Sequence, residues 1–314
     1  MKNKNISSRI YFIDNLRGAS ILAMMMIHST AYFLNDKVAY FIWDNLEWAV
    51  PVFVFCSFYM LFFKKQHFQG YQWFYFYKKR LKRLIFPYFL FLIIYFFLIY
   101  FFEAKKFNFD YLIANIFLYG GVDFNWLVLL FVYFTFLAPV FFKILENKLY
   151  KVLYFTLVVL ISFVFIFYKI NHRLIMWLPW SFYLFLIPYF QKKDNKKIFL
   201  ITVISLISFL FLRFLELKIG HNLSQYANKY PPTLYHLTFG SFWIGVLYFI
   251  FKDKEIKFLK FFSVNSYSLY FIHFLVLLMI VWLKFLPDNW FLFFGEIFFG
   301  SVMIQKLINY FYGK

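Results

Sequence analysis

Apolar runs of 17 to 22 residues, separated by short charged segments, recur along this chain of 314 residues. A helix of about 20 apolar residues crosses the hydrocarbon core of a bilayer. The pattern therefore predicts an all-α, polytopic membrane bundle of about ten transmembrane helices. The expected spans are residues 13–34, 43–63, 84–102, 125–142, 152–168, 174–190, 198–217, 233–251, 263–283 and 291–310.

Two further expectations concern the organisation of the chain. The apolar piece 111–119, which precedes Gly120 and Gly121, is too short to span and is expected to be interfacial or re-entrant. No soluble segment, solenoid repeat or low-complexity linker interrupts the spans, so residues 1–314 are expected to form one membrane-embedded domain. The first run follows a short polar tail and is long enough to span, so no cleavable signal is expected.

The basic residues predict the orientation of the chain. With a cytoplasmic N-terminus, 23 of the 33 Lys and Arg residues fall on the cytoplasmic side, while Arg17 and Arg213 lie inside spans. The other side receives only eight: Lys37, Lys105, Lys106, Lys169, Arg173, Lys218, Lys229 and Lys284. Because basic residues are enriched in cytoplasmic loops, both termini are expected inside.

Composition supports a membrane protein and accounts for the strongly positive charge. Hydrophobic residues make up 64% of the chain and the mean hydropathy is +0.68. The net charge of +19 then follows from the loop bias and from attraction to anionic lipid, so it requires no nucleic-acid partner. Cys56 is the single cysteine, which excludes an internal disulfide framework. The aromatic excess of 28% is interpreted as compositional background.

The first run contains ionisable residues, which are costly in the bilayer interior and therefore indicate a function. Arg17 and His28 are eleven residues apart, which places them on one helical face about 16 Å apart, and Asp14 lies one turn before Arg17. An alternative role for Arg17 is that of an interfacial residue whose charged end reaches toward water. An alternative role for His28 is that of a polar group that joins two helices. A neutral imidazole in an aqueous cavity is also suited to act as a general base.

Two more segments carry candidate chemistry. Arg80 and Arg83 share a helical face within a basic segment and could grip phosphate oxygens, although the surrounding lysines fit the orientation signal alone. Ser266, Tyr270 and His273 share a face of the run 263–283, where hydroxyl residues also commonly mediate helix packing.

The remaining intramembrane charges are candidates for an acceptor cavity. They are Asp44, Glu47, Glu216 and Glu296, with His236 nearby, and Glu216 is alternatively spaced for an ion pair with Arg213. No cluster has metal-ligand spacing, so no metal site is expected, and no glycine-rich phosphate loop or nucleophile elbow is present.

Several short segments, taken in order, resemble the acyltransferase-3 family of integral membrane O-acyltransferases. Arg17 and His28 resemble its R-x10-H signature, Pro51 to Ser57 its P-x-F-F-x-x-S-G segment, and Arg80 to Arg83 its R-x-x-R element. Asn125-Trp126-Leu127 is similar to its tryptophan-leucine segment, and Ser266 to His273 to its S-Y-x-x-Y-L-x-H segment. The chain departs from the family pattern at Phe58, where glycine is usual, and at Asn125, where many members have histidine.

The resemblance implies transfer of an acyl group, most often acetyl, from cytoplasmic acyl-CoA to a hydroxyl of an extracytoplasmic or membrane-linked carbohydrate. In that scheme His28 is the base or carries the acyl group, and Arg17, steadied by Asp14, positions the donor. The expected CoA-binding residues are Arg80, Arg83, Ser266, Tyr267 and His273. The expected acceptor-binding residues are Glu47, Asn125, Trp126 and Glu216. Acyl-CoA is a co-substrate, no tightly bound cofactor is expected, and the location is the plasma or inner membrane.

Two rival functions fit the composition. A transporter or flippase for a lipid-linked glycan would also need many helices, a polar cavity and cations facing phosphates, but the sequence shows no evident inverted repeat. A purely structural membrane subunit would use every buried ionisable group in helix packing. The several motifs in family order favour the acyltransferase.

Overall fold

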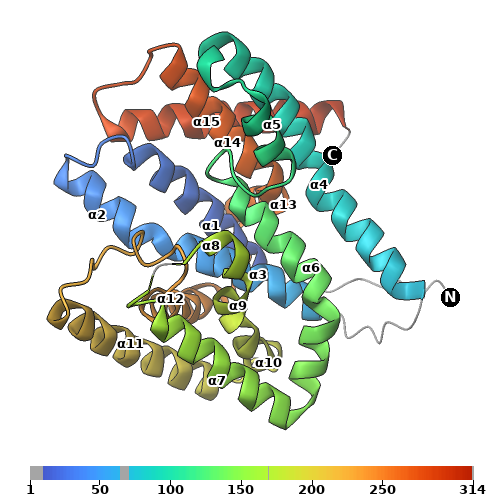
Figure 1. The fold of residues 1–314 in the computed structure, drawn as a ribbon, viewed down its shortest axis with the longest axis vertical. Coiled ribbons are helices and arrows are strands. Elements are labelled where there is room, and N and C mark those ends of the chain that lie inside the picture. The colour runs from blue at the N-terminus through green and yellow to red at the C-terminus, as the bar shows by residue number, and fades with distance from the viewer. Residues whose placement is uncertain (1–9, 64–70, 169, 313–314) are drawn as a thin grey trace.

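The computed structural model describes residues 10–63, 71–168 and 170–312 (Figure 1). Within these ranges the chain is helical and forms no strand, apart from an isolated bridge between Lys229 and Pro232. The expected all-α class is therefore confirmed. The first gap separates the end of α3 from the start of α4. The second gap is a single residue in the loop after α7.

The helices of the first half of the chain are α1 (Tyr11–Thr30), α2 (Lys37–Asn45), η1 (Leu46–Trp48), α3 (Ala49–Phe63), α4 (Tyr71–Phe102), η2 (Ala104–Lys106), α5 (Phe109–Ile116), α6 (Asn125–Glu146) and α7 (Lys148–Val164). Those of the second half are α8 (His172–Ile175), α9 (Trp177–Trp180), η3 (Ser181–Leu186), α10 (Ile187–Gln191), α11 (Asn195–Lys218), α12 (Leu234–Phe251), α13 (Lys257–Val264), α14 (Ser266–Trp282) and α15 (Trp290–Phe311).

The number of spans differs from the expected ten. Six continuous helical segments of the described chain are long and apolar enough to cross a membrane, and a seventh is added if α13 and α14 form one span. The count of about ten is therefore not confirmed. α7 has only 17 residues, and the polar residues of α1, among them Asp14 and Arg17, lower the hydropathy of that helix.

The expected span 174–190 is broken into short pieces. It forms α8, α9, η3 and α10 in place of one helix, and it contains Pro179 and Pro188. Proline removes a backbone donor and clashes with the preceding turn, which favours short and tightly wound segments. The apolar piece 111–119 forms the eight-residue helix α5 followed by a turn, too short to span.

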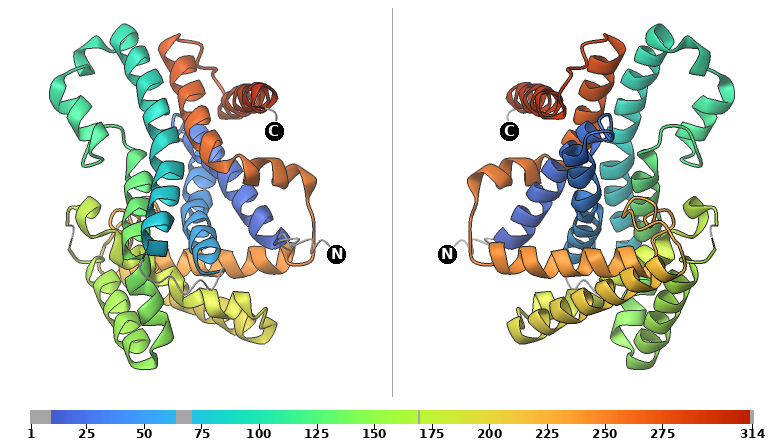
Figure 2. Two further views of the ribbon diagram at one scale, coloured as in Figure 1. Left: turned by 90° about the vertical axis from the view of Figure 1, so that its right-hand side faces the viewer. Right: turned by 90° about the vertical axis from the view of Figure 1, so that its left-hand side faces the viewer.

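α13 and α14 meet at a sharp bend next to Asn265. Their axes differ by 81°, and Figure 2 shows α13 lying crosswise before α14 rises beside α4. α11 and α12 lie side by side (Figure 1), and α15 crosses α14, with Figure 2 showing α15 end-on next to the upright α14, in agreement with their residue contacts. The bend brings α13 against the first half of α1 and α14 against the second half.

α1 is a central helix of the bundle. It contacts α2, α3, α12, α13, α14 and α15. Gly18 allows the closest of these approaches, because a Cβ atom at this position would overlap the backbone carbonyl of Leu259 on α13. Asn15 adds a hydrogen bond of 2.8 Å from its side-chain amide to the carbonyl of Lys254. α1 is thus surrounded by protein, as the cost of ionisable groups in lipid requires.

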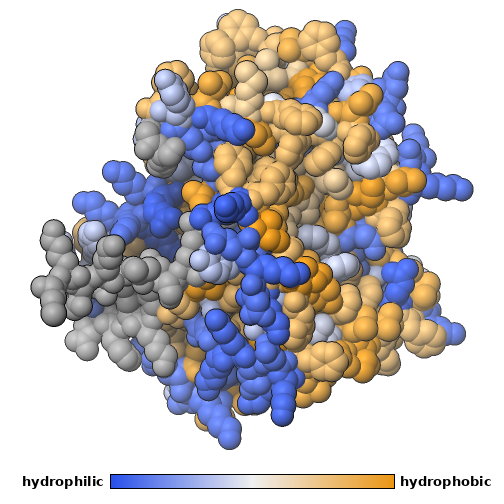
Figure 3. All heavy atoms as spheres, turned by 180° about the vertical axis from the view of Figure 1, so that it is seen from behind, coloured by the Kyte–Doolittle hydropathy of each residue, from blue (hydrophilic) through white to orange (hydrophobic). Residues whose placement is uncertain are grey.

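The other long helices divide into central and peripheral ones. The apolar window of α2 to α3 is 78% buried, whereas those of α4, α11 and α15 are 28%, 22% and 22% buried. Many exposed side chains of these three helices are apolar. Figure 3 shows one side of the molecule, where apolar side chains cover much of the surface and hydrophilic ones gather toward the lower centre and the left. α4, α11 and α15 therefore present the surface that a bilayer would cover. The chain is a multi-pass membrane protein.

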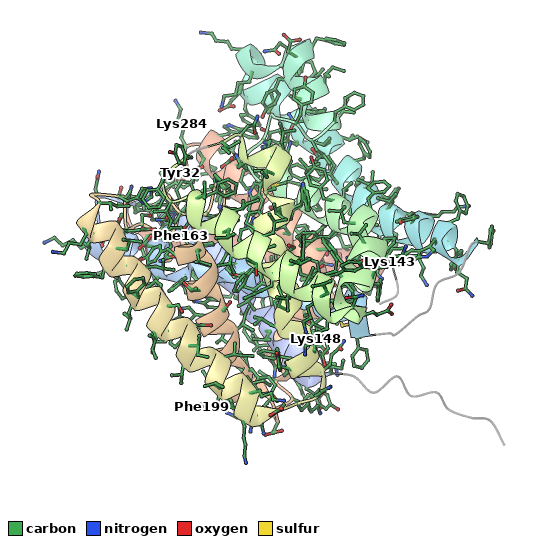
Figure 4. The ribbon with its side chains drawn as sticks, turned by 60° about the horizontal axis from the view of Figure 1, so that its bottom comes forward. Tyr32, Lys143, Lys148, Phe163, Phe199 and Lys284 are labelled. Carbon is green, nitrogen blue, oxygen red and sulfur yellow. The ribbon has the colours of Figure 1, made fainter. Side chains whose placement is uncertain are left out.

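Residues expected on opposite membrane sides lie apart in the structure. Figure 4 shows Lys143 and Lys148 near α6 and α7 on one side, and Tyr32 and Lys284 on the other. The orientation itself stays a prediction. Several residues on which it rests lie outside the described residues, namely Lys2, Lys4, Arg9, Lys64, Lys65, Lys169 and Lys314.

Gly18→Ala is predicted to destabilise the fold by about 1–3 kcal/mol, because the added methyl group must push α1 away from α13. The measurement is the unfolding temperature of purified protein in detergent. Gly295→Ala on α15 is the matched control, since a Cβ there meets no atom within 4 Å. Equal unfolding temperatures for the two variants would contradict the close packing at Gly18.

Candidate functional site

Two histidines from different helices meet near one end of α1. The ring centroids of His28 on α1 and His273 on α14 are 5.4 Å apart. His273 is fully buried, and its Nδ1 lies 2.8 Å from the carbonyl oxygen of Leu269. A carbonyl only accepts hydrogen bonds, so Nδ1 carries a proton and Nε2 of the neutral ring is an acceptor. That Nε2 has no hydrogen-bond partner among the described residues.

His28 differs from its neighbour in accessibility. Its side chain is half-buried, and it also contacts the ring of Phe274 at 6.1 Å between centroids. The arrangement gives one partly accessible imidazole beside one buried imidazole with a fixed proton. Such a pair is able to take a proton from a hydroxyl group.

α14 is held in place by two tyrosines of the Ser266 to His273 segment. The hydroxyl of Tyr267 donates to the carbonyl of Leu84 on α4 at 2.7 Å, and that of Tyr270 donates to the carbonyl of Phe124, also at 2.7 Å. Ser266 is buried at the start of the helix. The tyrosine protons are thus engaged by backbone carbonyls, and the two bonds fix the depth and rotation of His273.

The other end of α1 faces a group of three guanidinium groups, which we call the arginine end. Arg80 on α4 is half-buried and donates from Nε to the hydroxyl of Thr135 on α6 at 3.0 Å. Arg83 is exposed, and both Arg83 and Arg17 repel Arg80 electrostatically. Among the described residues none of the three forms an ion pair with a carboxylate. Like charges held together in this way form a site for an anion with several negative oxygens.

Asp14 has a different partner from the one expected. Its carboxylate accepts a hydrogen bond of 2.7 Å from the hydroxyl of Ser263 on α13. No ion pair between Asp14 and Arg17 is found in the ranges that the structure covers. Asp14 therefore ties α1 to α13 close to Gly18.

The segment between α11 and α12, the 219–233 loop, is anchored inside the bundle by three acidic residues. Asp44 accepts from the Ser224 hydroxyl at 2.8 Å and from the Gln225 backbone at 2.7 Å. Glu47 is fully buried and forms an ion pair of 2.8 Å with Lys229. These bonds attach the loop to Asp44 of α2 and to Glu47 of η1.

Glu216 anchors the same loop from α11. It is fully buried, accepts from the Asn228 amide at 3.2 Å, and lies 3.4 Å from Nδ1 of His221. The alternative pairing with Arg213 is not found in the described chain, because Arg213 donates to the hydroxyl of Tyr235 at 3.0 Å. Glu216 therefore helps to hold the 219–233 loop in place, through its contacts with Asn228 and His221.

Asn125 and Trp126 lie at the start of α6 but have different surroundings. Asn125 is fully buried, accepts from Arg173 at 2.5 Å and donates to the carbonyl of Gly120 at 2.7 Å. Trp126 packs against Tyr230, with ring centroids 5.1 Å apart, and lies beneath the Lys229 ammonium at 5.8 Å. Asn125 thus holds the turn before α6, whereas Trp126 faces the 219–233 loop. Glu296 lies apart from both, exposed on α15.

A family model described as an acyltransferase domain matches residues 10–304, nearly the whole chain. The chain belongs to the acyltransferase-3 family. The resemblance stated from the sequence is thereby confirmed, as is the expectation of an enzyme that transfers acyl groups other than aminoacyl groups. The same comparisons gave no match to a curated protein or to a solved structure.

The family match includes every candidate residue of this acyltransferase, and the structure gathers five of them into two groups. Arg17, Arg80 and Arg83 lie at the arginine end, while His28 and His273 lie together at the other end of α1. No group of three or more His, Cys, Asp or Glu residues in the described part of the acyltransferase is arranged to hold a metal ion. The expected absence of a tightly bound cofactor stays a prediction.

Sequence reasoning missed three partners of the acyltransferase site. Lys229 and Arg173 were treated only as loop cations, and Thr135 was not considered. For Lys229 a signal exists in the sequence, because the loop places Tyr226 and Tyr230 around it. For Thr135 and Arg173 no sequence signal names the partner, because their contacts join residues 55 and 48 positions apart.

Asn125→Ala is predicted to lower the stability of the acyltransferase by about 1–3 kcal/mol, since it leaves the Gly120 carbonyl without its partner and leaves Arg173 only its bond to the Leu118 carbonyl. Thermal unfolding in detergent measures the effect, with Asn45→Ala as the control because Asn45 is exposed. If Asn125→Ala unfolds like the control and loses only acyl transfer, Asn125 contacts a substrate instead.

Proposed function

We propose that this acyltransferase moves an acyl group, most often acetyl, from cytoplasmic acyl-CoA to a hydroxyl of an extracytoplasmic or membrane-linked carbohydrate. The single observation that carries the proposal is that α1 joins two chemically different ends. Three guanidinium groups gather at one end, and the His28–His273 pair lies about 16 Å further along the helix. The plasma or inner membrane is the proposed location, with both termini in the cytoplasm.

The arginine end is the proposed entry of the donor. Arg80 and Arg83 bind the phosphate groups of CoA, and Arg17 on α1 is near enough to Arg80 to act on it electrostatically. Arginine suits this role because its planar fork binds two phosphate oxygens at once. Ser266 and Tyr267 lie at the start of α14, near Leu84 on the arginine-bearing helix, and line the way inward. The extended pantetheine arm then carries the thioester toward His28.

The proposed reaction at His28 is a direct acyl transfer. The imidazole takes the proton of the acceptor hydroxyl while the hydroxyl oxygen forms a bond to the thioester carbonyl carbon. The tetrahedral intermediate then breaks its carbon–sulfur bond, and the imidazolium returns the proton to the departing CoA thiolate. The products are an ester and free CoA. In the covalent variant of this scheme, His28 itself first receives the acyl group.

His273 acts as a positioning residue in this scheme. Its Nδ1 proton is engaged by Leu269, so its Nε2 is available to accept a hydrogen bond from the neighbouring imidazole. A bond from the N–H of His28 would leave the other nitrogen of His28 unprotonated, which is the form that a general base requires.

His28→Ala is predicted to reduce acyl transfer about 10²–10⁴-fold, the usual effect of losing a general base. The measurement is mass spectrometry of cell-surface glycans together with CoA release by membranes supplied with labelled acetyl-CoA. His221→Asn is the matched control, because that histidine contacts only Glu216 among the ion pairs described. Equal acylation by wild type and His28→Ala would remove His28 from catalysis, and transport of a glycan without thioester consumption would favour the flippase alternative.

The double variant Arg80→Gln with Arg83→Gln is predicted to weaken acetyl-CoA binding more than about tenfold, because each charge-assisted bond to phosphate contributes about 1.5–3 kcal/mol. Calorimetric titration of purified protein in nanodiscs checks this. Lys79→Gln serves as the control, since Lys79 is an exposed cation on the same helix. An affinity equal to that of the control would contradict the phosphate role.

A further inference from the structure

A second cluster of polar and aromatic side chains lies against the 219–233 loop. We call it the Lys229 cluster, and its members are Glu47, Trp126, Trp180, Lys229, Tyr230 and His236. The Lys229 ammonium pairs with Glu47 at 2.8 Å and lies over the rings of Trp126 and Tyr230 at 5.8 and 5.1 Å. Trp180 joins the two halves, with its ring 6.0 Å from Trp126 and 5.6 Å from His236.

Three members of the Lys229 cluster carry buried polar atoms that have no partner within the described residues. They are Oε1 of Glu47, Nε1 of Trp180 and Nε2 of His236, and each of these side chains is 0% exposed. Trp180 offers a donor, and Glu47 and His236 each offer an acceptor, since Nδ1 of His236 donates to the side-chain oxygen of Gln225 at 3.1 Å. Buried polar atoms are normally paired, so three that are not, in one cluster, indicate a ligand with several hydroxyl groups.

The cluster is connected to the surface by a series of aromatic rings. Tyr40 and Tyr226 are 44% and 40% exposed. Trp43 lies between them, 5.8 Å from Tyr40 and 5.1 Å from Tyr226, and Tyr226 lies 5.6 Å from Tyr230 in the cluster. Aromatic rings are frequent throughout this chain. This series is distinguished by leading from the surface to the unpartnered polar atoms of the Lys229 cluster.

The Lys229 cluster also adjoins the proposed catalytic pair. The charge of Lys229 acts electrostatically on both His28 and His236. Phe124, two residues before Trp126, contacts Phe274 at 4.1 Å, and Phe274 in turn contacts His28. The Lys229 cluster and His28 are thus linked through Phe124 and Phe274.

Within the Lys229 cluster the two oppositely charged side chains balance, because Glu47 is matched by Lys229. The acids around the cluster, Asp44, Asp123 and Glu216, interact with Arg173 and Arg213. The cluster thus has no excess charge to attract an ionic ligand. An unbalanced charge in a ligand would meet a poorly hydrated site without a counter-ion, which is unfavourable.

We propose that the Lys229 cluster is the acceptor site of this acyltransferase and that it binds an uncharged, polyhydroxylated sugar ring. The apolar face of the ring stacks on Trp126 and Tyr230, and its hydroxyl groups bond to Glu47, Trp180 and His236. Lys229 and Glu47 determine specificity by keeping the site neutral. This inference rests on the proposed function, because it needs an acceptor that reacts at His28.

The test compares two acceptor probes that differ in charge, methyl glucopyranoside and the corresponding methyl glucuronide, with purified protein in nanodiscs and acetyl-CoA. Wild type is expected to prefer the neutral glycoside at least about tenfold in kcat/KM. Glu47→Gln leaves a net positive charge and moves this ratio at least about tenfold toward the glucuronide, whereas Lys229→Gln moves it the opposite way. The double variant Glu47→Gln with Lys229→Gln restores the wild-type preference, and Lys218→Gln, an exposed lysine at the end of α11, leaves it unchanged.

The ratio does not depend on the amount of folded protein, so a loss of stability in the single variants does not obscure it. Binding of the neutral glycoside is measured separately by saturation-transfer NMR, with Trp126→Ala expected to abolish the signal. Absence of the NMR signal in wild type overturns the inference. A specificity ratio that no variant changes also overturns it, and means that the cluster holds only water. Acetyl-CoA titration distinguishes the two failures: if CoA binds and the sugar does not, only the acceptor site is wrong, whereas loss of CoA binding overturns the proposed function.

Discussion

The enclosure of α1 is the constraint on which the structure depends. A membrane helix that carries Asp14, Arg17 and His28 cannot face lipid, because each ionisable group there would cost several kcal/mol. The fold meets this requirement by surrounding α1 with six other helices. The closest contact, at Gly18, is possible only because that residue lacks a side chain. The surface that a bilayer would cover is left to peripheral helices such as α4, α7, α11 and α15, which carry many exposed apolar side chains.

The two ends of α1 are stabilised by different kinds of interaction. At the arginine end, like charges are held together by helix packing and by the Arg80–Thr135 bond, and an anionic ligand would relieve their repulsion. At the other end the Glu47–Lys229 pair is buried, so removal of either partner would leave an uncompensated charge at a cost of about 3–5 kcal/mol. The pair therefore fixes the 219–233 loop while leaving the site neutral, and Asp44 and Glu216 strengthen the same attachment.

The sequence predicted the helical class and the family, since these follow from local patterns. The number of spans was not predictable in the same way, because Pro179 and Pro188 break one apolar run into short helices whose tertiary packing the hydropathy cannot show. The partners of the polar residues also escaped prediction. Glu216 and Asn125 looked like substrate contacts by residue type, yet the structure engages them with Asn228 and Arg173. Which charges pair depends on distant residues, and a single sequence carries no record of such pairs.

The separation of charge along α1 bears on how two unlike substrates reach one another. In the proposed scheme a polyanionic donor would be attracted to the arginine end and not to the neutral Lys229 cluster, so electrostatics alone would keep its phosphate groups on one side. Only the uncharged arm and thioester would continue toward His28. The acceptor, if neutral, gains nothing at the arginine end and is held by stacking and hydrogen bonds near His28. Because the charges of the described residues are arranged in this way, the reacting groups can meet at the imidazole pair while the charged part of the donor stays behind.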